Sequence, residues 1–518
     1  MLKVLRFCII LLYPCLGIAQ KTESSCVAAQ YPDPAIEIHS PAFMRKKIQF
    51  TSQGAMLHFI QQLRSPYLRT RSAGVSQEGR EIPLLIFSKP TQSQKPTVLI
   101  VAQQHGNEPA GGEAALAVAW QLTQTLYSSL LDKVNIIIVP RANPDGAAHF
   151  VRNLANGYNL NRDHLELVTP EARAIAKVFV EYQPDVVLDC HEFTVAVRWL
   201  EKFSLLQKYD GLLQSATTMN LPAALNDISL RFYYPAINRA FDQKHLTHSL
   251  YYTTSHDVQN KIVSMGGIVP DTSRNIAGLR NAISFLLETR GVGLGTAHFK
   301  RRVMTHMTAI HAVFDTTVQH ANEIISLHDR LNNQISESAG RGQIIILGRA
   351  LKEKHELSML DKQGHTKLLL VDWRSAFHIQ KTLTRQRPFS YLLAPTEKLA
   401  AERLTMLGIK VYQITNPLHL SVQQYQIVSV MKKTKHDVTG SAGAANEVIQ
   451  VKTQLKSLTM NVQHYFYVPL NQPLANLAIA ALEPESESSY VSNHLIKIRR
   501  DSFKLPLFSL TIVTSSLL

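Results

Sequence analysis

Cysteine is scarce in this chain, and the few cysteines form no metal-binding pattern. The 518 residues contain four. Cys8 and Cys15 lie in an apolar N-terminal run, and Cys26 and Cys190 stand far apart. No closely spaced cysteine pair occurs, so a cysteine-based metal site is excluded. A disulfide between Cys26 and Cys190 is formally open, but nothing in the sequence supports it.

Two other absences narrow the class of protein. No segment after the N-terminus is long and apolar enough to span a bilayer, so we expect no transmembrane segment in the mature chain. The formal net charge is +15, but lysine and arginine are spread along the whole sequence. The densest basic clusters, at 432–437 and 497–501, are short and lack interleaved aromatic residues. We therefore expect no nucleic-acid partner.

The first 19 residues have the composition of a signal peptide. A basic start, MLKVLR, precedes the apolar run FCIILLYPCLGIA. Small residues at Gly17 and Ala19 predict cleavage after Ala19. Pro14 directly before Cys15 is a poor fit to a lipoprotein signal. The sequence therefore predicts a secreted or periplasmic protein.

Buried strands that alternate with helices indicate the fold class. Continuously apolar runs at 96–103, 134–140, 184–191 and 282–288 are separated by helical patterns. One such helix is expected over Pro170–Tyr182 with Thr169 as its cap, and others over 113–130 and 298–333. This predicts an α/β fold with a mixed central sheet and helices on both faces. Near Gly340 the composition changes, and shorter strands predict a smaller β-rich α+β domain.

A histidine and a carboxylate stand three residues apart in the stretch QHGNEPAGG. His105 and Glu108 follow a buried strand, and we expect the glycines to let the turn bend tightly. Zinc prefers histidine nitrogen and carboxylate oxygen, and a catalytic zinc keeps one position open for water. The pair alone is a weak signal, because His320 and Glu323 have the same spacing within a helix.

The ends of three buried strands strengthen this signal. His105, His191 and Glu288 each follow such a strand, and sites in open α/β sheets form at this edge. Glu192 should point to the other face, while Asp189 shares the face of His191 and is either its partner or a sheet-edge carboxylate. Four further histidines on the 298–333 helix are expected to be surface residues: His306, His311, His320 and His328.

The stretch between the two strand-end histidines is rich in arginine, asparagine and glycine. Arginine suits carboxylates and developing oxyanions, because its planar fork is permanently charged. With this stretch the sequence resembles the zinc metallocarboxypeptidase family of the A and B type, in a bacterial secreted branch with an extra C-terminal domain. The resemblance rests on ordered motifs over about 51–329: HGNE at His105, ANPDG at Ala142, Arg152, NLNRD at Asn159, DCHEF at Asp189 and LLETRG at Leu287.

The resemblance implies a role for each matched position. His105, Glu108 and His191 would hold one zinc ion per chain. Glu288 would be the general base and then the general acid, and Arg152 would stabilise the oxyanion. Asn161 and Arg162 would bind the terminal carboxylate of a peptide or peptide-like substrate. The composition and patterns of the whole sequence predict five segments: a signal peptide (1–19), an N-terminal extension (20–50), a catalytic domain (51–335), a linker (336–344) and a β-rich C-terminal domain (345–518).

One departure from the family leaves the terminal-residue preference open. Classical members carry a tyrosine just before a Gly-Gly turn, whereas here Lys261–Gly267 contains none, and Tyr251 and Tyr252 are offset. Instead, PDTSRN offers Arg274 as a substrate-binding residue, with Asp271 and Asn275 beside it. Three functions remain: a metallocarboxypeptidase, a zinc amidohydrolase acting on N-acyl amino acids or cell-wall peptides, and an inactive binding module on the same fold.

Overall fold

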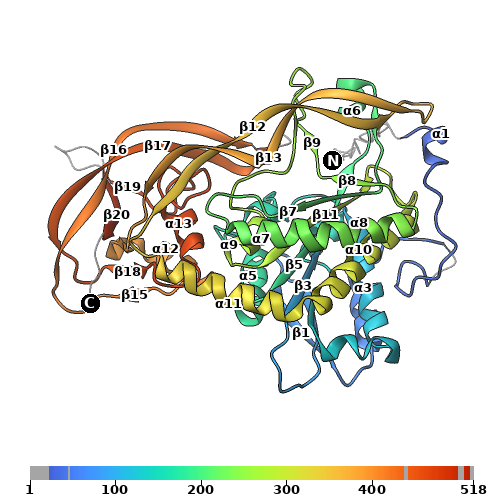
Figure 1. Cartoon of the computed structure of the whole chain (residues 1–518), viewed down its shortest axis with the longest axis horizontal. Coiled ribbons are helices and arrows are strands. Elements are labelled where there is room, and N and C mark those ends of the chain that lie inside the picture. The colour runs from blue at the N-terminus through green and yellow to red at the C-terminus, as the bar shows by residue number, and fades with distance from the viewer. Residues whose placement is uncertain (1–22, 45–46, 437–441, 500–506, 514–518) are drawn as a thin grey trace, which may run out of the picture.

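An eight-stranded mixed sheet forms the centre of the N-terminal part of the protein (Figure 1). The computed structural model describes residues 23–44, 47–436, 442–499 and 507–513. The central strands β4, β3, β5 and β11 are parallel, whereas β2 and β7 pair antiparallel with their central neighbours. In sheet order the strands are β1 (Leu68–Val75), β2 (Glu81–Phe87), β4 (Asn135–Val139), β3 (Thr97–Ala102), β5 (Val186–Thr194), β11 (Ile283–Val292), β7 (Gly211–Ser215) and β8 (His248–Leu250). The predicted mixed α/β sheet is confirmed.

Alternate residues of β3 show how both faces of this sheet are covered. Val98 and Ile100 are buried in one core with α3 (Pro109–Leu122) and α10 (Phe299–Gln319). Leu99 and Val101 are buried in a second core with α5 (Pro170–Tyr182) and α9 (Ser273–Leu279). Successive side chains of a strand point to opposite faces, so a continuously apolar strand fits a sheet that is buried on both sides.

Helix α5 begins and ends where the sequence predicts. The hydroxyl of Thr169 accepts a hydrogen bond from the backbone N–H of Ala172 and donates one to Asp163 Oδ2 at 2.7 Å. The cap therefore satisfies one free N–H of the first turn and ties the helix to the preceding loop.

We expect Thr169→Ala to lower the free energy of unfolding by about 1–2 kcal/mol, because it removes the cap and a buried hydrogen bond. Denaturant titration of the purified chain measures this change. Thr169→Ser keeps the hydroxyl and is the matched control. Equal unfolding midpoints for the alanine and serine variants would contradict the capping role.

Two predicted helices have different ends in the structure. The expected 298–333 helix is broken at His320, where φ is −112° and ψ is 23°, into α10 and α11 (Ala321–Glu337). The sequence has no glycine or proline there, and the His320 ring stacks on Phe232 with 3.8 Å between centroids. The expected 113–130 helix is α3, which begins at Pro109, ends at Leu122 and is followed by two short 3-10 turns.

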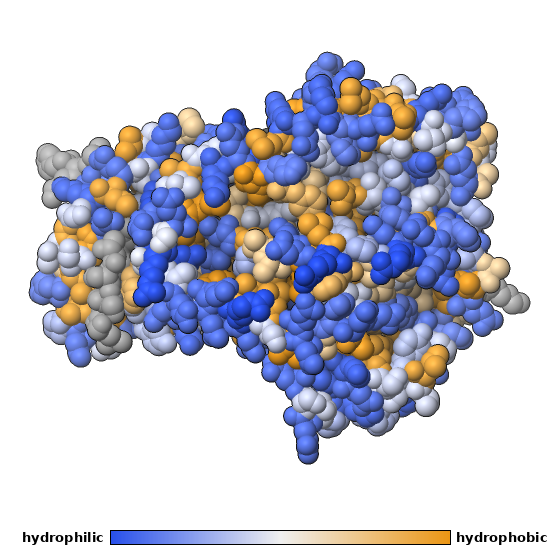
Figure 2. Space-filling view, in the orientation of Figure 1, coloured by the Kyte–Doolittle hydropathy of each residue, from blue (hydrophilic) through white to orange (hydrophobic). Residues whose placement is uncertain are grey.

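The C-terminal part begins with a long hairpin rather than the expected short strands. Strands β12 (Gln343–Leu360) and β13 (Thr366–Gln386) arch over the N-terminal part (Figure 1). Their sheet includes three short strands from the N-terminal part: β6 (Leu206–Gln207), β9 (Thr253–Thr254) and β10 (Val263–Ser264). In Figure 2, hydrophobic side chains gather in the hollow beneath this hairpin, whereas the outer surface is largely hydrophilic.

A second C-terminal sheet follows the hairpin. The closing strand β20 (Leu507–Val513) lies between β14 and β16. The other strands of this sheet are β14 (Ser390–Leu393), β15 (Tyr412–Gln413), β16 (His419–His436), β17 (Ala442–Asn461), β18 (Phe466–Pro469) and β19 (Ile498–Arg499). The remaining helices are α1 (Ser25–Ala28), α2 (Gln53–Gln62), α4 (Pro144–His149), α6 (Arg198–Phe203), α7 (Ala223–Ile228), α8 (Tyr234–Gln243), α12 (Lys398–Met406) and α13 (Ala475–Leu482).

The two parts of the chain share a core. The core on the α5 side of the central sheet also contains buried residues of the C-terminal part, such as Tyr391, Leu404 and Ile479. The expected signal peptide at 1–19 lies outside the described residues. None of the helices in the described ranges has both the length and the apolar composition needed to cross a membrane.

Candidate active site

The three predicted metal ligands lie together at one end of the central strands. His105 comes three residues after β3, Glu108 directly precedes α3, and His191 lies in β5. All three side chains are buried. Among the described residues they are the one group of three or more His, Cys, Asp or Glu side chains whose donor atoms all lie within 4.8 Å of one another.

The donor atoms of this group face a common point. The two Nδ1 atoms of His105 and His191 are 3.0 Å apart. Glu108 Oε1 is 2.9 Å from Nδ1 of His105, and its Oε2 is 2.9 Å from Nδ1 of His191. Two imidazole nitrogens and a carboxylate that converge in this way form the donor set of a catalytic zinc site.

The second nitrogen of each imidazole faces an oxygen. His105 Nε2 lies 3.0 Å from Asn159 Oδ1, and His191 Nε2 lies 2.9 Å from Asp189 Oδ1. Asn159 Oδ1 also accepts the backbone N–H of Asn161, which fixes it as the oxygen end of the amide. The oxygens of Asn159 and Asp189 favour a proton on each Nε2 and turn Nδ1 toward the shared point, as such partners do for imidazoles that bind metals, while the amide nitrogen of Asn161 also lies 3.1 Å from Nε2 of His191.

The charges around this point favour a cation. Burial, reinforced by the charge of Arg152, lowers the pKa of His105 to about 4, so this ring is neutral at pH 7. Burial also lowers the pKa of His191, but Asp189 and Glu108 outweigh it and raise the value to about 10. The point between the donors thus requires a positive charge, which a divalent metal supplies. The residues present fit the metal that the sequence predicts.

The glycines of QHGNEPAGG serve close packing rather than an unusual backbone conformation. None of them has a positive φ, and the left-handed residue of this turn is Gln103, with φ of 50°. A Cβ on Gly106 would lie 1.9 Å from the backbone carbon of Gly146. A Cβ on Gly111 would lie 2.8 Å from Cβ of Cys190. The turn at His105 is tight, as expected, with the backbone N–H of Glu108 bonded to the carbonyl of His105 at 3.1 Å, and the glycines let this turn and α3 approach their neighbours.

Asp189 contacts the imidazole of His191, so this carboxylate is the partner of His191 and not merely a carboxylate at the sheet edge. It also accepts a hydrogen bond from Gln104 Nε2 at 2.5 Å, and Gln104 in turn contacts His164. We expect Asp189→Asn to weaken metal binding about 10–100-fold, because such partners orient a ligand and raise its basicity. Competition with a chromogenic chelator measures the metal affinity.

Asp185→Asn is the matched control for that prediction. Asp185 lies just before β5, so it is at the opposite end of the strand, and its Oδ1 is 2.6 Å from His328 Nδ1. This variant should keep the wild-type metal affinity. Equal weakening by both substitutions would mean that the effect comes from the strand and not from the partner of His191.

Glu288 lies beside the three donors. It is in β11, is 8% exposed, and is paired in register with His191 of β5. Burial and the charge of Glu108 raise its pKa to about 8, although His191 and Arg152 act in the opposite direction. A carboxyl group with a pKa near neutrality can both accept and return a proton.

Arg152 and Tyr251 also belong to this site, beside Glu108 and Glu288. Arg152 Nη1 donates to Glu108 Oε1 at 2.8 Å, and its side chain is 39% exposed. Tyr251 is close enough to Glu288 and Arg152 for their charges to act on its phenol, and burial raises the pKa of that phenol. A cationic and a phenolic group are thus available where charge develops on a substrate oxygen.

The three predicted substrate-binding residues lie next to one another. Asn161 Oδ1 accepts the backbone N–H of Ser273 at 2.9 Å, and Asn161 Nδ2 lies 3.4 Å from Asp189 Oδ2. Arg162 is half-buried and Nη1 donates to the carbonyl of Asn161. Arg274 is buried in the first turn of α9, directly after Ser273. The charge of Arg162 acts on Arg274, so the two guanidinium groups are neighbours.

Other polar residues have structural partners away from this group. Glu192 points to the opposite face, as expected, and accepts hydrogen bonds from Arg302 and from the backbone N–H of Ala110. Cys26 and Cys190 are both free thiols. The four histidines along α10 and α11 each contact a different residue: His306 with Thr289, His311 with Gln121, His320 with Glu323 and His328 with Asp185. The expectation that all four lie on the surface is wrong for His306, which is fully buried.

Two residues that help to position the metal ligands, one directly and one through Asp189, were missed from the sequence. Asn159 contacts His105, and Gln104 contacts Asp189. Both lie inside the quoted motifs, Asn159 two residues before Asn161 and Gln104 directly before His105. Asparagine and glutamine are common in loops, so their types alone gave no signal.

A comparison with protein-family models agrees with this geometry. The model described as zinc carboxypeptidase matches residues 55–299, which contain all eight predicted site residues. Residues 55–299 belong to the zinc carboxypeptidase family. This segment is thus a peptide-bond hydrolase of the metallopeptidase class.

Similarity to curated proteins extends beyond the zinc carboxypeptidase segment. Carboxypeptidase 2 of Trichophyton equinum is 28% identical over 445 residues, which cover 84% of this chain and 81% of that protein. Carboxypeptidase D of Homo sapiens is 33% identical over 128 residues, covering 21% of this chain and 9% of that protein. A metallo-carboxypeptidase structure from Burkholderia cenocepacia is 20% identical, with a TM-score of 0.39, and the match covers 51% of this chain and 68% of that one.

Proposed function

We propose that the protein is a zinc-dependent carboxypeptidase that removes the last residue of peptides with a free C-terminal carboxylate. One zinc ion per chain would be held by Nδ1 of His105, Nδ1 of His191 and the carboxylate of Glu108. The observation that carries this proposal is the convergence of these donors directly beside the buried carboxyl group of Glu288.

The bound metal would acidify the attacking water and polarise the scissile carbonyl. Glu288 takes a proton from that water as the oxygen attacks the carbonyl carbon, and then gives the proton to the leaving amine. The guanidinium of Arg152 stabilises the negative charge on the carbonyl oxygen. Arg162 binds the terminal carboxylate, and Asn161, whose amide contacts Ser273 and Asp189, holds this wall of the site in place.

Export and the division of the chain are part of the same proposal. The composition of residues 1–19 supports a cleaved signal peptide and a secreted or periplasmic location. Residues 51–335 would form the catalytic unit, 336–344 a linker and 345–518 an accessory region. Mass spectrometry of the secreted protein tests the cleavage site, which we place after Ala19.

The test of the proposed function is a comparison of substrate classes with zinc-loaded full-length protein. One peptide is offered with a free and with an amidated C-terminus, beside N-acyl amino acids and cell-wall peptides. We expect release of the last residue from the free peptide only, and no release after metal chelation. Preferential hydrolysis of N-acyl amino acids or cell-wall peptides would indicate an amidohydrolase. No hydrolysis of any class would indicate a binding module.

A further inference from the structure

Arg274 is a buried cation whose hydrogen bonds all go to neutral groups. It is 3% exposed. Its Nε donates to Asn275 Oδ1 at 3.3 Å, and its Nη2 donates to the carbonyl of Gly267 at 3.0 Å. It forms no ion pair with any residue in the described ranges. Burial lowers the pKa of Arg274 to about 10, because the charge lacks full compensation. A buried charge of this kind is costly unless an anion pairs with it.

Two of the other buried arginines are matched by carboxylates, whereas Arg141 and Arg387, like Arg274, donate only to neutral groups. Arg302 pairs with Glu192, and Arg290 pairs with Glu23. Arg280, at the end of the same helix as Arg274, also has a neutral partner, the carbonyl of Leu407, but its guanidinium lies over the ring of Phe179. Arg274 differs from Arg280 because it lies beside Arg162 and the site.

The surroundings hold the guanidinium of Arg274 in one place. Asn275 Nδ2 donates to the carbonyls of Gly267 and Val269, and its Oδ1 accepts both Arg274 Nε and the backbone N–H of Thr217. A Cβ on Gly266 would lie 2.9 Å from Arg274 Nη1, so the glycine makes room for the guanidinium. An arginine fixed in this way is preorganised for a planar anion.

Arg274 adds a second guanidinium to the site, since its charge and that of Arg162 act on each other and Ser273, directly before it, donates to Asn161. Arg162 is proposed to bind the terminal carboxylate. Asp189, the carboxylate whose charge acts on Arg274, is already bonded to His191 and Gln104. A C-terminal residue with an acidic side chain carries two carboxylates within a few ångströms of each other, and thus matches the pair of cations.

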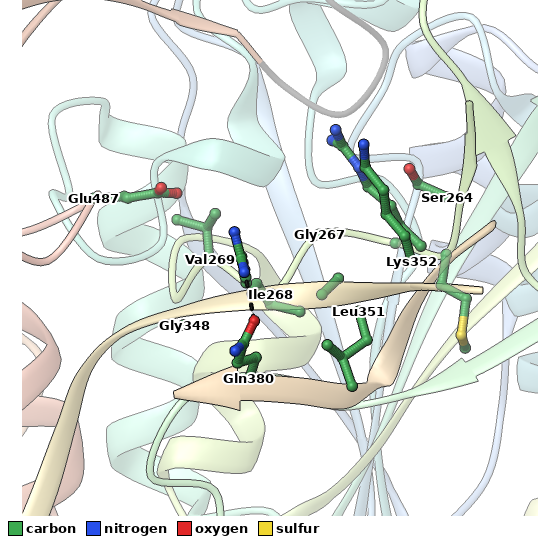
Figure 3. A pocket seen from close by; sticks show the side chains of 14 residues that line it. Ser264, Gly267, Ile268, Val269, Gly348, Leu351, Lys352, Gln380 and Glu487 are labelled. Carbon is green, nitrogen blue, oxygen red and sulfur yellow. Dashed lines mark hydrogen bonds between the residues drawn. The ribbon is translucent and has the colours of Figure 1, made fainter. Parts of the chain in front are cut away.

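Gly266 and Gly267, which contact the guanidinium of Arg274, also line a cavity whose charged residues are mostly cations. Residues Ser264–Val269 and the β12–β13 hairpin enclose a cavity of about 840 Å³. Figure 3 shows Lys352 beside Ser264, with Glu487 on the far side of the cavity. Three cations, Arg349, Lys352 and Arg374, line this space against one carboxylate, Glu487. A cavity lined by one sign of charge attracts ligands of the opposite sign.

We propose that Arg274 binds the side-chain carboxylate of the substrate's last residue, so that the protein prefers peptides ending in glutamate or aspartate. This inference rests on the proposed carboxypeptidase function and adds its substrate class. Glutamine has the shape of glutamate without the charge, so a pair of peptides that differ only in a terminal glutamate or glutamine isolates the ion pair.

The test measures kcat/KM of zinc-loaded full-length protein on this peptide pair. We expect the wild type to favour glutamate about 10–100-fold, as a charged hydrogen bond would give. In Arg274→Gln the ratio should fall to near one, and Arg274→Lys should keep part of it. Arg280→Gln, a buried arginine of the same helix, should keep the wild-type ratio.

Two results would overturn the inference. One is equal hydrolysis of both peptides by the wild type. The other is an unchanged ratio in Arg274→Gln with both rates reduced, which would mean that Arg274 binds the terminal carboxylate or supports the fold. If the wild type cleaves no peptide, the proposed function fails, and calorimetry still tests Arg274. Free glutamate should then bind more tightly than free glutamine to the wild type and equally to Arg274→Gln, and equal binding to the wild type contradicts the inference.

Discussion

Glu288→Gln should lower kcat by about 10²–10⁴-fold while the metal content stays at the wild-type level. The substitution keeps the shape of the side chain but removes the group that accepts and returns the proton. The imidazoles of His105 and His191 are held by Asn159 and Asp189, and Glu288 makes neither of these contacts. Release of the terminal amino acid measures the rate, and elemental analysis of the same sample measures the metal.

Glu171→Gln is the control for the loss of a buried carboxylate. Glu171 is fully buried in α5, where Oε1 accepts the backbone N–H of Gln77 at 2.9 Å. Its substitution should affect stability and leave kcat near the wild-type value. Full activity in Glu288→Gln would rule out the proton transfer proposed for this residue.

Removal of the metal should have the second large effect. His191→Ala deletes one donor and exposes the carboxylates of Glu108 and Asp189 to each other, so the bound metal should fall from about one per chain to near zero. The metal stabilises the transition state by several kcal/mol, so activity should fall on the order of 10³-fold or more. Dialysis against a chelator should have the same effect on the wild type, and added zinc should restore activity to the wild type only.

His328→Gln is the control for the loss of a histidine–carboxylate contact elsewhere on the same strand. His328 Nδ1 is 2.6 Å from Asp185 Oδ1 on the far end of β5 from the site. This variant should bind the metal and respond to added zinc as the wild type does. Stoichiometric zinc in His191→Ala would contradict the assigned ligand set.

Much of the site could be predicted because the residues at the C-terminal ends of parallel neighbouring strands meet at one edge of the sheet. His105, His191 and Glu288 each come at the end of an apolar run, and parallel strands β3, β5 and β11 bring those ends to one edge. The same alternation predicted that Glu192 would point away from His191, where it meets Arg302. Local patterns sufficed because each residue's place depends on its own strand.

The features that the sequence did not predict depend on contacts between segments that are far apart in the chain. The break at His320 has no glycine or proline to mark it, and the stacking partner, Phe232, is far away in sequence. The pairing of β13 with β10 joins residues 373–374 to 263–264, and no local pattern encodes such a long-range register. The lack of an ion pair between Arg274 and any other described residue likewise became visible only in three dimensions.

The most direct test of the account is the product pattern of zinc-loaded full-length protein on one peptide with a free C-terminus. Mass spectrometry over time follows the products, with Glu288→Gln run in parallel. The account predicts fragments that shorten from the C-terminus by one residue at a time in the wild type and no comparable shortening in the variant. Cleavage at internal bonds, or no cleavage by protein that holds its zinc, would contradict it.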